Sequence, residues 1–489
     1  MDAKNFNWKW WTKEPILIIM IVSLIVRAVY LLFNYPLWWD SHVYIGMGKY
    51  IFSSGQIGIW EMFRPLLHPF ILGGMWKIGI DPVIGGKILD LMYSLIIIYL
   101  TYLLALRIYN KTIAWLAALI VSLTPLFVMF TGIILADPLA MIFGLLGLLV
   151  LMEKKGSSTK VALTNNRIHL FFSGFLLFFS FFSRFPQGIW FAAVFLVLLW
   201  RKRYLMEKIK QLISIGAGFI IPLLVYLWFN YYLYADPFKP LTSGSFIVTT
   251  ATWMYGTGIT YYLTHFFLTT PIYLFFFYYL YGEIKSRNWD ETKIVIILIS
   301  LATITYFTYV PRKEPRYFAT ILPLLAIPVS YSLIKIYHHM VNSKKPVVTP
   351  TFFVIFCVLL SLIPITFISN LERVPSFKEE LRGTIEEYEI NGVILSSNPL
   401  PLSYTDNTVI TLSGMEFAPK IYGQNKGKYG LLLINDCDLS CDPQDQSCAA
   451  KREDLFNFIL AENKEITSKS YIIQRTGQRC TYTLYLPSK

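Results

Sequence analysis

A carboxylate, Asp40, directly follows two tryptophans at the end of the first long apolar stretch. Tryptophan side chains favour the headgroup level of a bilayer, so Asp40 is expected where lipid-borne and water-borne molecules meet. Because a positioned carboxylate can accept a proton from a reacting hydroxyl, Asp40 is a candidate general base. The alternative is an interfacial aspartate without a chemical role. Tyr44 follows in the same amphipathic run, and Arg64 and His68 come after a glycine-rich turn.

A second carboxylate, Asp137, lies between two apolar stretches and precedes a proline. A charged group in hydrocarbon costs about 2.5–3.5 kcal/mol, so Asp137 is expected to face a cavity or to have a cationic partner. It could orient an acceptor molecule or an arginine, or it could simply separate two helices. Arg184, at a later turn, is a candidate phosphate ligand, with a snorkelling membrane anchor as the alternative.

Three cations surround one glutamate late in the apolar region: Arg312, Lys313 and Arg316 around Glu314. A guanidinium offers a phosphate two directed, charge-assisted hydrogen bonds, so this cluster is suited to hold a phosphate. Arg316 and Lys313 are the predicted ligands. The alternative is a group of cationic anchors at the end of a membrane span.

The elements that must position these residues are apolar helices. Of the 489 residues, 55% are hydrophobic and 15% charged, whereas soluble domains have about 25% charged residues. This composition indicates a membrane protein and excludes disordered, collagen-like and coiled-coil chains. The apolar stretch 64–80 is short and contains two prolines, which favours a re-entrant or interfacial segment. Apolar windows long enough to cross a bilayer occur at about eleven places: 15–33, 84–106, 112–131, 133–152, 168–184, 187–200, 211–234, 262–281, 294–311, 317–337 and 350–369.

Positive charge alternates between the loops that these spans define. Lys and Arg number 20 on the side of the N-terminus and nine on the opposite side. Cytoplasmic loops carry the excess of positive charge, so the N-terminus is predicted to be cytoplasmic and the C-terminal region extracytoplasmic. Residues 1–370 have a net charge of +16 and residues 371–489 a net charge of −3. The basic excess therefore belongs to the membrane part, and nucleic acid is not an expected partner.

Residues 371–489 are predicted to form a small α/β domain after a membrane domain of residues 1–370. An even number of cysteines outside the cytoplasm indicates disulfides, and the spacing lacks the CxxC pair and nearby histidine of a zinc site. Four cysteines allow three pairings, and the spacing leaves all three open. The cysteines are Cys437, Cys441, Cys448 and Cys480. Apolar runs predict strands at 392–396, 409–412 and 430–434, a helix at 452–462, and a closing hairpin at 471–474 and 481–485.

In this order, the motifs resemble those of the GT-C superfamily glycosyltransferases that use polyprenyl-phosphate sugars. The likeness is to the branch of the dolichyl-phosphate-mannose protein mannosyltransferases and aminoarabinose lipid A transferases. One short run is also similar to a motif of the GPI-anchor mannosyltransferases, Lys313 to Tyr317. The family often has Asp-Glu where this chain has Asp40-Ser41, so a divalent metal is not supported there. The matching positions are Arg27, Trp39-Asp40, Tyr44, Arg64-Pro65 with Pro69, Asp137-Pro138-Leu139, and Arg316-Tyr317 with Pro323.

The resemblance implies a polytopic α-helical membrane protein with about eleven transmembrane helices, followed by an external α/β domain. It implies transfer of a sugar, a hexose with mannose among the candidates, from a polyprenyl phosphate to an acceptor hydroxyl. The transfer would take place on the extracytoplasmic face with inversion at the anomeric carbon. The acceptor would be a protein, a lipid or a glycan.

The chemistry of this reaction assigns roles to the candidate residues. Asp40 and Asp137 are the catalytic candidates, with Asp40 as the general base. Two alternatives from other classes stay open. One is a flippase or transporter of lipid-linked sugars, which should have polar residues near span centres, and the other is a non-catalytic scaffold whose external domain binds a partner. The predicted ligands of the donor phosphate are Arg64, Arg184, Lys313 and Arg316, and the further site candidates are Tyr44, His68 and Glu314.

Overall fold

The computed structural model describes residues 15–33, 35–154, 161–250, 252, 255–268, 270–287, 289–341, 349–362, 377–442, 444–473 and 477–488. The chain divides into two compact units. A helical unit consists of Met1–Phe33, Asp90–Thr131 and Ala136–Ser369, and a mixed α/β unit consists of Asn34–Leu89, Gly132–Leu135 and Asn370–Lys489. The first loop, which carries Asp40 and Arg64, therefore belongs to the same unit as the C-terminal residues. The predicted domain boundary at residue 370 differs from this division, because residues 34–89 and 132–135 also belong to the α/β unit.

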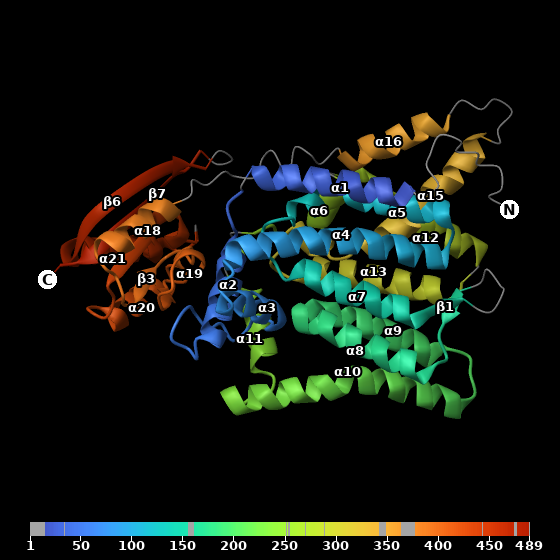
Figure 1. Cartoon of the computed structure of the whole chain (residues 1–489), viewed down its shortest axis with the longest axis horizontal. Coiled ribbons are helices and arrows are strands. Elements are labelled where there is room, and N and C mark those ends of the chain that lie inside the picture. Colours follow the sequence, from blue (N-terminus) through green and yellow to red (C-terminus); the bar gives the residue numbers. More distant parts are fainter. Residues whose placement is uncertain are drawn as a thin grey trace. The chain divides into compact units, whose positions relative to one another are not determined.

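The helical unit is built from apolar helices that lie side by side (Figure 1). A two-stranded hairpin, β1 (Met152–Lys154) and β2 (Val161–Leu163), follows α7. α4 (Pro82–Ile108) begins in the α/β unit and continues here. The other helices are α1 (Pro15–Leu32), α5 (Lys111–Leu123), α6 (Pro125–Met129), α7 (Asp137–Leu151), α8 (Arg167–Ser183), α9 (Gly188–Trp200), α10 (Leu205–Tyr234), α11 (Lys239–Ile247), α12 (Phe275–Ser286), α13 (Glu291–Tyr309), α14 (Arg316–Ala319), α15 (Leu322–Val341) and α16 (Pro350–Leu362), with the short turns η2 (Phe185–Gln187), η4 (Leu263–Phe267) and η5 (Pro271–Leu274).

Each apolar window of the sequence contains helix, but prolines divide three of the windows. The window 112–131 is split between α5 and α6 because Pro125 restricts Thr124 to an extended conformation. Pro271 is the first residue of η5 and Pro323 is the second residue of α15, positions in the first helical turn where a proline is tolerated. Within the described residues, four helices are long and apolar enough to cross a membrane, α1, α4, α10 and α13. The number of about eleven spans stays a prediction.

Small residues allow α8 and α10 to approach closely. A Cβ atom added to Gly174 would overlap the carbonyl oxygen of Ile215, and one added to Gly218 would overlap that of Phe171. Close backbone approach through small residues is a common way for apolar helices to associate without a hydrophobic driving force.

Arg27 is a fully buried charge in the middle of α1. Its guanidinium donates hydrogen bonds to the Ser23 hydroxyl at 2.6 Å and to the Ser122 carbonyl at 3.0 Å. It also lies 5.4 Å from the centre of the Phe127 ring. Arg27 thus connects α1 to the end of α5.

The α/β unit contains a five-stranded sheet in the order β4-β3-β5-β7-β6. The first three strands are parallel, with Ile394 aligned with Val409 and Leu431, and the last two form an antiparallel hairpin. The predicted strands at 392–396, 409–412, 430–434 and 481–485 and the predicted helix at 452–462 are confirmed. The first hairpin strand was predicted at 471–474 but runs over Asn463–Ile472, so the two share only residues 471 and 472, and residue 474 lies outside the described residues. The elements are α2 (Trp39–Phe52), α3 (Leu67–Lys77), α18 (Lys378–Glu387), β3 (Ile394–Ser396), α19 (Pro401–Tyr404), β4 (Val409–Thr411), α20 (Ala418–Asn425), β5 (Leu431–Asn435), η6 (Asp436–Leu439), α21 (Gln446–Glu462), β6 (Asn463–Ile472) and β7 (Arg479–Pro487).

Two disulfides hold the C-terminal part of this unit. Cys437 pairs with Cys480, and Cys441 pairs with Cys448. The first joins η6 to β7, so it closes the end of the sheet at the central strand β5. The prediction of disulfides is confirmed, and the structure selects one of the three possible pairings.

Candidate functional site

One guanidinium group bridges two carboxylates in the α/β unit. Arg64 Nη1 lies 3.0 Å from Asp40 Oδ1, and Arg64 Nε lies 2.5 Å from Glu61 Oε2. Burial lowers the pKa of Arg64, but the charges of Glu61 and Asp40 outweigh burial and the pKa is raised overall. Arg64 therefore stays charged in a largely buried position. Glu61 was not among the predicted site residues, and its spacing of three from Arg64 is the signal that could have included it.

The placement of Asp40 depends on how α2 begins and on what α2 packs against. Ser41 accepts a hydrogen bond from the Trp38 backbone amide at 3.2 Å and donates one to the Ile133 carbonyl. Further along α2, a Cβ atom added to Gly48 would lie 2.6 Å from the backbone nitrogen of Gly73 in α3. The backbones of α2 and α3 therefore touch, and Asp40 stands on a helix that is fixed at its start and along one side.

Tyr44 lies one turn after Asp40 and is enclosed by two predicted site residues. The Arg64 guanidinium carbon is 5.3 Å from the centre of the Tyr44 ring, and the His68 ring meets it edge-on at 5.4 Å. His68 is fully buried, and burial lowers its pKa to about 3. A neutral, buried His68 supports the Tyr44 ring rather than offering positive charge to a phosphate.

A second carboxylate–arginine pair lies in the helical unit. Asp137 is the first residue of α7, and its carboxylate forms an ion pair with Arg184, which follows α8. Their side chains are 5% and 14% exposed. The cationic partner expected for Asp137 is thus Arg184. This pairing also argues against the reading of Arg184 as a snorkelling anchor, because its charge is directed at a buried partner.

Glu314, Arg316 and Tyr317 form a third charged group. Arg316 contacts both carboxylate oxygens of Glu314, with Nε at 2.5 Å and Nη2 at 3.3 Å, and the Tyr317 hydroxyl donates to the same carboxylate at 3.2 Å. The guanidinium carbons of Arg184 and Arg316 lie 5.4 and 5.7 Å from the centre of the Tyr317 ring. Two guanidinium groups therefore meet around one tyrosine, and each is paired with a carboxylate.

Lys313 is placed differently from the two arginines. Its ammonium group donates hydrogen bonds to the carbonyls of Thr308 and Val310, the latter at 2.8 Å, at the end of α13. It is only 5% exposed. These bonds satisfy carbonyls that the helix end leaves without an intrahelical partner. The geometry favours a capping role for Lys313 over the predicted role in binding phosphate.

The predicted site residues fall into two groups, one in each unit. Asp40, Tyr44, Arg64 and His68 lie together in the α/β unit, where Glu61 joins them. The remaining predicted residues, Asp137, Arg184, Lys313, Glu314 and Arg316, lie in the helical unit.

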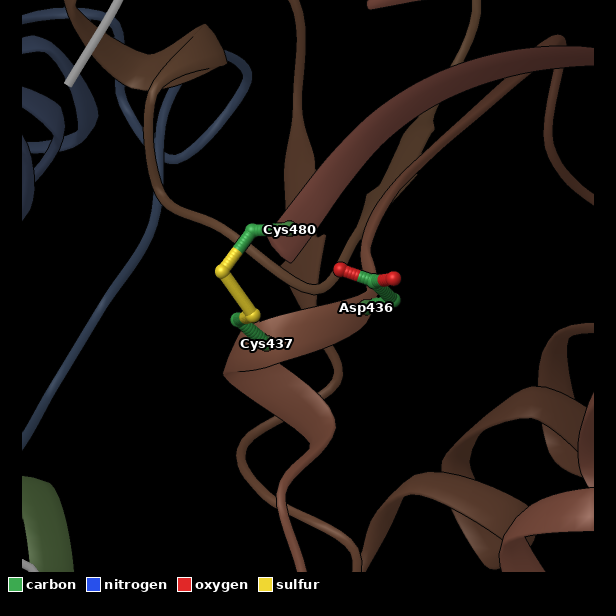
Figure 2. Close-up of side chains that lie close together, drawn as sticks. All are labelled: Asp436, Cys437 and Cys480. Atoms are coloured by element: carbon green, nitrogen blue, oxygen red, sulfur yellow. A yellow bond between two sulfur atoms is a disulfide. The ribbon is translucent and has the colours of Figure 1, made fainter. Parts of the chain in front are cut away.

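Among the described residues, one further group has the spacing of a metal site, namely Asp436, Cys437 and Cys480 (Figure 2). Both cysteines are consumed by their mutual disulfide, so they cannot act as thiolate ligands. The Asp436 carboxylate accepts a hydrogen bond from the Thr481 backbone amide at 2.8 Å. This group is a structural link between η6 and β7.

One family model matches part of this chain. The sequence model of the family described as dolichyl-phosphate-mannose-protein mannosyltransferase matches residues 63–229. This region includes Arg64, Asp137 and Arg184, whereas Asp40 precedes it and Arg316 follows it. No curated protein matches the chain by sequence.

Solved structures match over nearly the whole chain. ArnT from Cupriavidus metallidurans, bound to undecaprenyl phosphate, has a TM-score of 0.57 at 11% identity, with 96% of this chain and 98% of that chain covered. The oligosaccharyltransferase AglB from Archaeoglobus fulgidus, in complex with an inhibitory peptide and a dolichol-phosphate, has a TM-score of 0.55 at 11% identity, covering 98% and 75%. The chain has the GT-C fold.

A third solved structure is also similar to nearly the whole chain. The arabinofuranosyltransferase AftD from Mycobacteria has a TM-score of 0.52 at 10% identity, covering 98% of this chain and 40% of that chain. The GT-C structures similar to this chain are thus glycosyltransferases of different specificity. Their likeness establishes the architecture, and the chemistry has to be argued from the charged groups described above.

The pair Asp137–Arg184 leads to a prediction about stability. Arg184→Leu should lower the free energy of unfolding by about 3–5 kcal/mol, because it leaves a buried carboxylate without its counter-charge. Adding Asp137→Leu to this variant should recover most of the loss, since a buried ion pair can often be replaced by apolar side chains. Thermal unfolding in detergent would measure both effects.

A matched control is the exposed pair Arg167–Glu207 in the same unit, at 3.7 Å with side chains 55% and 51% exposed. Arg167→Leu should change stability by less than about 1 kcal/mol. An Arg184→Leu variant as stable as this control would show that the buried pair contributes little to the fold.

Proposed function

We propose that the chain is a membrane glycosyltransferase that moves a sugar from a polyprenyl-phosphate donor to an acceptor hydroxyl. The reaction takes place on the extracytoplasmic face and inverts the anomeric carbon. The proposal is supported by the GT-C fold and by one observation above all: both predicted catalytic carboxylates, Asp40 and Asp137, hold an arginine at positions that the sequence had singled out.

Asp40 serves as the general base in this proposal. As the acceptor oxygen bonds to the anomeric carbon, its proton passes to the Asp40 carboxylate, while the bond between that carbon and the phosphate oxygen breaks. The guanidinium of Arg64, 3.0 Å away, favours the ionised carboxylate that a base requires. Asp137 acts through Arg184, which it holds in place.

The arginines serve the leaving group. A departing polyprenyl phosphate carries negative charge that needs no proton when guanidinium groups meet it. Arg64, Arg184 and Arg316 have this role, and each is neutralised by a carboxylate in the structure. Lys313 is left out because its ammonium group caps α13.

The proposed orientation in the membrane rests on how Lys and Arg are distributed among the loops. The N-terminus is cytoplasmic and the disulfide-bonded domain is extracytoplasmic, as the excess of Lys and Arg on one set of loops favours. The two disulfides fit this orientation, because disulfides persist in oxidising compartments.

Replacing Asp40 by asparagine tests the catalytic role directly. Asp40→Asn keeps the shape of the side chain but removes the proton acceptor, so transfer should fall by about 10²- to 10⁴-fold. Purified protein would be incubated with a panel of radiolabelled polyprenyl-phosphate sugars and candidate acceptors, and the transferred label would be counted. Binding of the donor should stay close to normal.

Asp454 of α21 gives a matched control, because it is exposed and the same replacement removes the same charge. Asp454→Asn should transfer sugar at the normal rate. Full transfer by well-folded Asp40→Asn protein would contradict the proposal and make Asp137 the next candidate for the base.

Replacing Arg316 tests the phosphate site. Arg316→Ala should weaken donor binding by about 10- to 100-fold, the effect of losing hydrogen bonds between charged groups worth about 1.5–3 kcal/mol. Arg316→Lys should recover only part, because an ammonium group cannot reproduce two directed contacts. The donor concentration that gives half-maximal transfer is the measurement.

The control for this variant is the exposed residue Arg203. Arg203→Ala should leave the donor requirement unchanged. If Arg316→Ala behaves like this control, Arg316 contributes only to the Glu314 contact.

The orientation has its own test. A periplasmic or luminal reporter fused after Lys489 should be active in intact cells, because the last residues belong to the extracytoplasmic domain in this proposal. Activity of a cytoplasm-only reporter at the same position would reverse the orientation.

A further inference from the structure

α2 makes contacts on two opposite sides. With about 100° of rotation per residue, Asp40 and Tyr44 lie on one side, whereas His42, Gly46 and Lys49 lie on the opposite side. The first side carries the Arg64 contacts described above. The second side is buried against the C-terminal residues of the same unit.

The contacts on the second side converge on a short segment around α19. His42 Nδ1 and the Ser403 hydroxyl share a hydrogen bond at 2.6 Å. Lys49 Nζ donates to the Thr405 carbonyl at 2.8 Å and pairs with Asp406 Oδ1 at 3.0 Å. We refer to residues 403–406, Ser403 to Asp406, as the seat of α2.

Apolar packing surrounds these polar contacts. Val43 and Met47 of α2 belong to the same core as Leu402, Leu431 and Tyr482 of the C-terminal part. A Cβ atom added to Gly46 would lie 2.7 Å from Leu402 Cδ2, so a larger residue would force the Leu402 side chain to shift. The helix therefore has little freedom to slide or rotate.

Two more contacts attach the neighbouring residues to the same segment. The indole of Trp76 in α3 donates to Asp406 Oδ1 at 3.1 Å, so one carboxylate binds both α2 and α3. Gly58 exchanges backbone hydrogen bonds with the β4 edge, to Asn407 and from Val409, both at 3.1 Å. The loop between α2 and α3 thus extends the sheet beyond β4.

The ion pair between Lys49 and Asp406 joins a buried lysine to an exposed aspartate. Its side chain is 4% exposed, whereas that of its partner Asp406 is 60% exposed. Burying a charge against an exposed partner yields little net stability, because the desolvation of the lysine offsets the attraction. What the contact does provide is direction, since within the described part of the chain the ammonium group contacts the Thr405 and Asp406 oxygens of the seat.

We propose that Lys49 and the seat are positioning elements that hold Asp40 for catalysis, so that the C-terminal part of the chain is required for the chemical step. This inference rests on the proposed role of Asp40 as the base. A base displaced by about 1 Å can reduce the rate of a reaction about 10²-fold while leaving other contacts of the substrate in place. Loss of the seat should therefore lower kcat and spare the donor KM.

The test compares two lysines that form ion pairs in the same unit. Lys49→Met keeps the aliphatic chain and removes the charge, and it should lower kcat at least 10-fold with the donor KM within twofold of normal. The matched control is Lys469→Met, which breaks the Lys469–Glu380 pair at 2.6 Å between β6 and α18. Lys469 makes no recorded contact with α2 in the described residues, and this variant should keep kcat within twofold.

Hydrogen exchange of full-length protein separates loss of position from loss of fold. In Lys49→Met the amides of α2 should exchange faster, while those of β5 and β7 should keep their normal rates. Ser403→Ala is a milder second variant that removes only the His42 hydrogen bond, and it should lower kcat in the same direction by a smaller factor.

Three outcomes would overturn the inference. They are normal kcat in Lys49→Met despite faster exchange in α2, an equal loss of kcat in Lys469→Met, and a loss of transfer that only matches a smaller folded fraction. Failure of the proposed function would look different, because Asp40→Asn would then retain transfer. Normal Lys49→Met together with inactive Asp40→Asn would reject the seat and keep the base.

Discussion

Positive charge among apolar helices must be neutralised close by, because an unpaired ion in a low-dielectric environment is unfavourable by several kcal/mol. The site arginines of this chain all meet this constraint through carboxylates. Arg64 has Asp40 and Glu61, Arg184 has Asp137, and Arg316 has Glu314. These pairs fix the ends of α2, α7, α8 and α14, so the placement of the helices and the placement of the charges depend on each other.

The same pairing affects how the proposed donor would bind. A guanidinium that contacts the phosphate must give up or share its carboxylate, so the net gain is the difference between two charge-assisted contacts. A negatively charged phosphodiester competes better for a guanidinium than a neutral sugar hydroxyl does. With the roles proposed above for the arginines, ion pairs that form in the absence of donor favour a charged donor over a free sugar. The competition would be strongest around Tyr317, which lies near the guanidinium groups of both Arg184 and Arg316.

Much of the fold could be predicted from the sequence because apolar windows and strand patterns are local. The C-terminal strands and the disulfides followed from such patterns, and the divided helices are explained by Pro125, Pro271 and Pro323. Asp40 could be singled out by the two tryptophans before it, and Asp137 because a carboxylate between apolar stretches needs a cavity or a cationic partner. The capping role of Lys313 and the seat of α2 could not be predicted. His42 and Ser403 are separated by 361 residues, and no sequence pattern connects them.

The α/β unit combines residues from the early and the late part of the chain, and this affects how it folds during synthesis. Its early part ends at Leu89 and its late part begins at Asn370, 281 positions further along the chain. At about 5–20 residues per second, a ribosome needs roughly 15–60 s to cover that distance. During this time Val43 and Met47 lack the partners that bury them. The core around the helix that carries Asp40 is therefore completed only when the last strands of the chain have left the ribosome.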